Sequence, residues 1–81
     1  MPTIFRQDGY RVYFYSHEPN EPPHVHVDKG GASAKVRLEP IALSRSVGFQ
    51  AKEIAAIMGL VREHREQWVE AWHGYFGTER G

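Results

Sequence analysis

Alternation with a period of two residues dominates the first half of the chain. Three stretches share it: residues 10–15, YRVYFY, residues 24–28, HVHVD, and residues 32–39, ASAKVRLE. This period is typical of strands that bury one face. Asp8-Gly9 and the segment 29–31, KGG, predict tight turns, because such residues tolerate positive φ. With a further β-run before Asp8, we expect an antiparallel sheet of about four strands within residues 3–39.

The second half of the chain changes to a helical period. Apolar side chains recur at three- and four-residue intervals from Ile54 to Tyr75, which predicts an amphipathic helix over about residues 48–75. Pro40 should end the last strand, and residues 41–48, IALSRSVG, should connect the sheet to the helix. Gly59 is a weak point in this helix that could mark either a kink or close packing. Residues 78–81 are expected to form a loose tail.

These elements predict a single α+β domain over residues 1–81, in which one face of the sheet is covered by the long helix. One helix on one face is enough to make such a small sheet stable. The side chains that point inward in both patterns should form the core, namely Val12, Phe14, Val25, Val27, Val36, Leu38, Ile54, Ile57, Val61, Trp68 and Trp72.

Composition excludes several classes of protein. There is no cysteine, hence no disulfide and no cysteine-ligated metal centre, which fits a cytoplasmic protein. No apolar run approaches the ~20 residues that cross a bilayer, so no membrane association is expected. Ten basic and ten acidic side chains cancel. Binding to nucleic acid would therefore depend on a local basic patch.

The face of the sheet turned away from the helix is the expected binding face. Its polar side chains combine cations with aromatic rings, which suits phosphate binding and base stacking as well as a protein interface. A solvated sheet face with no binding role would show a similar composition. The expected members are Arg11, Tyr13, Tyr15, His24, His26, Asp28, Lys35, Arg37 and Glu39.

Three histidines in residues 16–31, SHEPNEPPHVHVDKGG, are candidates for chemistry. His24 and His26 leave the same face of a strand, Asp28 lies one step further, and His17 precedes them in a proline-rich loop. This set could hold a divalent metal with an open position, or provide a general base, so His17, His24 and His26 are the catalytic candidates. The alternative is that the imidazoles only hydrogen-bond loop carbonyls.

The order of motifs resembles the DUF4160 family of small bacterial proteins. The matching pieces are 1-MPTI-4, the aromatic strand 13-YFY-15, 22-PPHVH-26, 35-KVRL-38 and 63-EHREQWVEAW-72. The resemblance implies a single α+β domain. The function of this family is uncharacterised, and no catalytic residues are established for it. It also implies a small partner protein of the DUF2442 type, with which the family forms a toxin–antitoxin-like pair, and operator DNA or RNA as a further partner.

Three hypotheses for the function remain open. The first is a binding module of such a two-gene system, which engages the small partner protein and nucleic acid. The second is a histidine-dependent ribonuclease or other hydrolase, with or without a metal, in which Lys35 or Arg37 holds a phosphate. The third is a homodimeric structural subunit, because a single-layer sheet leaves strand edges open to pairing.

Overall fold

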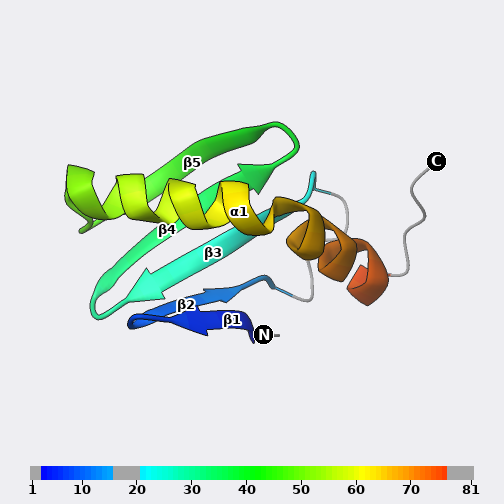
Figure 1. Ribbon diagram of the computed structural model, residues 1–81, viewed down its shortest axis with the longest axis horizontal. Coiled ribbons are helices and arrows are strands. Elements are labelled where there is room, and N and C mark those ends of the chain that lie inside the picture. The colour runs from blue at the N-terminus through cyan, green and yellow to red at the C-terminus, as the bar shows by residue number, and fades with distance from the viewer. Residues whose placement is uncertain (1–2, 16–20, 77–81) are drawn as a thin grey trace.

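The computed structural model describes residues 3–15 and 21–76, which form one antiparallel sheet and one long helix (Figure 1). The five strands lie side by side in chain order: β1 (Thr3–Gln7), β2 (Tyr10–Tyr13), β3 (His24–Lys29), β4 (Ala32–Leu38) and β5 (Ile41–Val47). Helix α1 (Ala51–Phe76) runs across one face of this sheet (Figure 1). The predicted α+β fold is therefore confirmed, with five strands in place of about four.

The turns follow the predicted chemistry. Asp8 and Gly9 join β1 to β2 with φ angles of 52° and 87°, and Gly30 in the next hairpin has a φ of 60°. Two consecutive positive φ values match the twist of the flanking strands, which is why Asp-Gly is favoured there. β4 ends at Leu38, before Pro40, as the sequence predicts.

The expectation that residues 41–48 only connect the sheet to the helix is wrong. Residues Ile41–Val47 form the edge strand β5, which pairs with β4 along its whole length. Ser44 and Ser46 interrupt the apolar alternation in this segment, so the sequence pattern did not indicate a strand. Ser44 is an extra residue in this pairing, because Leu43 faces Val36 whereas Arg45 faces Lys35.

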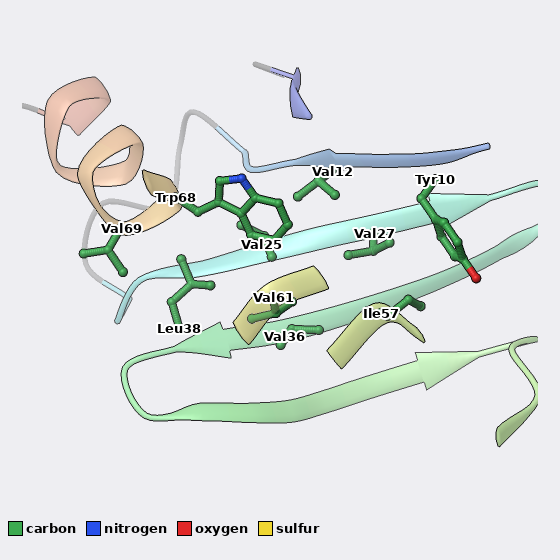
Figure 2. Packing of buried hydrophobic residues seen from close by; sticks show 10 residues of the cluster. All are labelled: Tyr10, Val12, Val25, Val27, Val36, Leu38, Ile57, Val61, Trp68 and Val69. Atoms are coloured by element: carbon green, nitrogen blue, oxygen red, sulfur yellow. The ribbon is translucent and has the colours of Figure 1, made fainter. Parts of the chain in front are cut away.

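The core fills the space between the sheet and α1. Figure 2 shows valines of the strands directed toward Ile57, Val61 and Trp68 of the helix. Of the predicted core residues only Ile54 is half-buried, and Tyr10 and Val69 are additional members. The final turns of α1 extend beyond the strand ends, where Trp72 packs on Phe14 with ring centroids 5.4 Å apart.

Helix α1 continues without a break through Gly59. A Cβ atom added at Gly59 would meet nothing within 4 Å, so of the two alternatives close packing does not account for this glycine. Within residues 3–15 and 21–76, no helix has the length and apolar character needed to cross a membrane.

Candidate binding face

The face of the sheet opposite α1 carries a row of four side chains that crosses β2 to β5. Tyr13 lies opposite His26, His26 opposite Lys35, and Lys35 opposite Arg45. Residues directly opposite each other in antiparallel strands project from the same face. This cross-strand row spans three strand spacings, about 14 Å. We call this side of the sheet the uncovered face, because no helix or strand of the described ranges packs on it (Figure 1).

Arg45 belongs to this row because of the extra residue in β5. Strict alternation would place Arg45 on the helix side, together with Ile41 and Leu43. The bulge at Ser44 shifts the alternation by one residue and brings Arg45 opposite Lys35. Sequence reasoning missed Arg45, since it treated the whole segment as a loop. The signal was the pair Ile41 and Leu43 directly after a turn.

The aromatic half of the row is tightly packed. Tyr13 is only 5% exposed and stacks on His26, with ring centroids 5.4 Å apart and an interplanar angle of 21°. Tyr15 meets the His26 ring edge-on at 4.5 Å. Arg11 also lies over the Tyr13 ring, with its Cζ atom 4.6 Å from the ring centroid. Tyr13 is therefore a supporting ring, whereas the half-buried Tyr15 and His26 are nearer to solvent.

Tyr13 and Asp28 form a hydrogen-bonded pair on this face. The Tyr13 hydroxyl donates to Asp28 Oδ2 at 3.0 Å, while Asp28 Oδ1 is buried and finds no hydrogen-bond partner among the described residues. Burial, followed by hydrogen bonds to Tyr15 and Asp28 and the charge of Asp28, raises the pKa of Tyr13 well above its usual range. Tyr13 therefore stays a neutral donor at physiological pH.

A pocket of about 260 Å³ lies over the cross-strand row. One side of it is aromatic and the other is cationic, with the Ser33 hydroxyl group also in its wall. Lys35 Nζ is 2.9 Å from Glu21 Oε1, in an ion pair whose side chains are 28% and 43% exposed. The lining residues are Tyr13, Tyr15, His26, Ser33, Ala34, Lys35 and Arg45.

Basic side chains dominate the uncovered face, although the whole chain is neutral. By strand register, Asp28 is the one acidic residue among the described strand positions of this face. Two cation pairs lie directly opposite each other, Arg6 with Arg11 and Lys35 with Arg45. Like charges in this arrangement destabilise a sheet. The basic members are Arg6, Arg11, Lys35, Arg37 and Arg45.

His24 has the register expected for the uncovered face, with its ring centroid 5.1 Å from that of His26, but it is not exposed there. Its side chain is fully buried, with its ring 4.8 Å from that of Trp72, because the last turns of α1 enclose the start of β3. Its Nδ1 lies 3.0 Å from the Pro22 carbonyl oxygen, which can only accept, so Nδ1 carries a proton. The alternative that this imidazole bonds a loop carbonyl is thus confirmed for His24.

The other residues predicted for the metal site and the binding face do not form one cluster among the described residues. No group of three or more metal-ligating side chains occurs within residues 3–15 and 21–76, and His17 lies outside the described residues. Glu39 was expected on the uncovered face, but it turns toward the helix and accepts a hydrogen bond from Arg65 at 3.3 Å. Arg37 is exposed on the uncovered face, opposite His24 in the register.

The fold and this face together define a small α+β protein with a five-stranded sheet, one covering helix and one basic aromatic face. Comparison with protein families matches residues 9–73 to DUF4160, described as a domain of unknown function. The chain therefore belongs to the DUF4160 family, as its motifs suggest. No curated protein and no solved structure matches it significantly.

Proposed function

We propose that this protein is a binding module of a two-gene, toxin–antitoxin-like system and that its uncovered face binds nucleic acid. The observation that carries the proposal is that two pairs of cations lie directly opposite each other on neighbouring strands, Arg6 with Arg11 and Lys35 with Arg45. Directly opposed cations cost stability in a sheet, and one neighbouring carboxylate partly offsets each pair, Asp28 opposite Arg11 and Glu21 on Lys35. A phosphate backbone that lies across the face would neutralise both pairs.

The distribution of charge supports the same proposal. Most acidic side chains of α1 lie away from the sheet, as the exposed residues Glu63, Glu66 and Glu70 illustrate. A chain without net charge thus separates its charges into a basic sheet face and a more acidic helix. Such a face attracts a polyanion locally, and the attraction weakens as salt rises.

The second component of the proposal is a small partner protein of the DUF2442 type. This component rests on the family resemblance. Co-expression with the product of the neighbouring gene, followed by affinity purification and size-exclusion chromatography, tests it. We expect the two chains to elute together. Elution of this chain by itself, at the mass of one copy, would contradict both this component and the homodimer alternative.

A histidine-dependent hydrolase is the weaker candidate. A ribonuclease of that kind needs two groups that exchange protons with one phosphate. Of the candidates His17, His24 and His26, His17 lies outside the described residues and His24 is buried against Trp72, so His26 is the accessible histidine among the described candidates. The geometry therefore favours binding over cleavage.

The test of nucleic-acid binding is fluorescence anisotropy with a labelled oligonucleotide, measured over a range of salt concentrations. We expect the variants Arg37→Gln and Arg45→Gln to weaken binding, each reducing the salt dependence of log K by ~0.7 for a single strand. The matched controls are Lys52→Gln and Arg62→Gln, which remove the same charge from exposed positions on α1. Equal losses in both sets would refute the proposed location of binding.

A further inference from the structure

We infer that the pocket on the uncovered face is a subsite for one unpaired nucleotide of a single-stranded nucleic acid. The inference rests on the proposed function, which concerns the whole face, and assigns a ligand chemistry to one site within it. The pocket is aromatic on one side and cationic on the other. A nucleotide has the same division, with a flat base at one end and a phosphate at the other.

The base would occupy the aromatic side. Tyr15 and His26 lie at 61° to each other with centroids 4.5 Å apart, so the two rings form a corner. A base placed in this corner stacks on one ring and meets the edge of the other, which are the two favourable geometries for aromatic pairs. Tyr13 stacks on His26 from the neighbouring strand and is held in place by its hydrogen bond to Asp28.

The phosphate would occupy the cationic side. Lys35 and Arg45 are directly opposite each other, and the bulge at Ser44 is what brings Arg45 into this position. Arginine can bond two phosphate oxygens at once, whereas lysine acts as a point charge. The Ser33 hydroxyl lines the same pocket and can donate to or accept from the sugar or phosphate.

A single strand fits this face better than a duplex. The outer strands of the sheet are four spacings apart, about 19 Å, whereas the major groove of DNA is only ~12 Å wide. In addition, a base within a duplex is stacked on its neighbours, so it cannot turn its flat side onto Tyr15 or His26. Unpaired bases are free to do so, which is the common mode of sequence-tolerant recognition by aromatic sheet faces.

Glu21 occupies the place that the phosphate would take. Its carboxylate is 2.9 Å from Lys35 Nζ, although both side chains remain partly exposed. A carboxylate on a binding lysine competes with a phosphate for the same donor. Binding of the nucleotide would therefore displace Glu21, and removal of the Glu21 charge should increase affinity.

The test compares binding of an unstructured oligoribonucleotide, the same sequence as deoxyribonucleotide, and its duplex, each by fluorescence anisotropy with the whole chain. We expect either single strand to bind at least tenfold more tightly than the duplex. Tyr15→Leu should lower single-strand affinity by ~5- to 150-fold, the range for loss of one base–aromatic stack. Tyr15→Phe keeps the ring and should retain affinity. Glu21→Gln should raise affinity severalfold.

Tyr75→Leu is the matched control, because Tyr75 is a half-exposed tyrosine on α1, away from the pocket. Thermal melts establish that each variant is folded. If duplex and single strand bind alike and Tyr15→Leu changes nothing, while Arg45→Gln still weakens binding, the subsite is refuted and the proposed function stands. If Tyr15→Leu weakens binding of the partner protein but not binding of the single-stranded oligonucleotide, the subsite is also refuted. If no nucleic acid binds at all, both proposals fail.

Discussion

Arg65 is expected to fix helix α1 to the sheet by two contacts of unequal strength. Its Nε donates to the Leu38 carbonyl oxygen at 2.8 Å, and its second guanidinium nitrogen donates to Glu39 Oε2 at 3.3 Å. A hydrogen bond from a charged donor contributes about 1.5–3 kcal/mol to stability. The ion pair with Glu39 is more than one third exposed on both sides, so it contributes at most about 1 kcal/mol.

We therefore predict that Arg65→Met, which keeps much of the aliphatic packing, lowers the free energy of unfolding by about 2 kcal/mol. For a domain of this size that corresponds to a decrease in Tm of roughly 8–16 °C. Glu39→Gln removes only the ion pair and should cost less than about 1 kcal/mol. The loss in the double variant should equal the loss in Arg65→Met.

Urea unfolding followed by tryptophan fluorescence measures these effects. Trp68 and Trp72 are the two tryptophans of the chain, and both are buried on the same helix, so their emission reports release of α1 from the sheet. If Glu39→Gln lowers the free energy of unfolding as much as Arg65→Met does, the hydrogen bond to the Leu38 carbonyl makes no separate contribution to stability. The assignment of the main anchoring role to that bond would then be refuted.

Three further outcomes follow from the structure. Gly59→Ala should raise stability by ~1 kcal/mol, because the helix continues through this position and the added Cβ has open space; a loss in urea unfolding would contradict this. The pKa of Tyr13 is raised in the folded state, so its contribution to stability should be complete below pH ~10 and lost as pH rises through the folded-state pKa. The free energy of unfolding should therefore decline less at alkaline pH in the variant Tyr13→Phe than in the parent protein. Zinc added to an NMR sample should leave the His24 ring signals unchanged, because that ring is enclosed by Trp72; joint shifts of His24 and His26 would contradict this.

Much of the fold was predictable because each local signal agreed with the next. The period of two in residues 10–15 and 32–39 predicted which side chains enter the core, and Asp8-Gly9 predicted a hairpin with two positive φ values. Trp68 and Trp72, four residues apart, predicted the buried stripe of the helix. These signals depend only on neighbours along the chain.

The site was less predictable, because its key features depend on contacts between distant segments. Arg45 joins the pocket through a bulge in an edge strand, and a single extra residue reverses the alternation on which face assignments rely. His24 has the correct parity for the uncovered face, but Trp72, 48 positions later in the chain, covers it. The Glu21 to Lys35 ion pair likewise joins a loop to a strand.

Amide NMR mapping tests whether the uncovered face binds nucleic acid. A ¹⁵N-labelled sample is titrated with an unstructured oligoribonucleotide in low salt. We predict that the largest shifts occur in β3, β4 and β5, around Ser33, Lys35 and Arg45, with little change along the exposed side of α1. Shifts that concentrate on α1, or no shifts at saturating oligonucleotide, would show that the uncovered face does not bind nucleic acid.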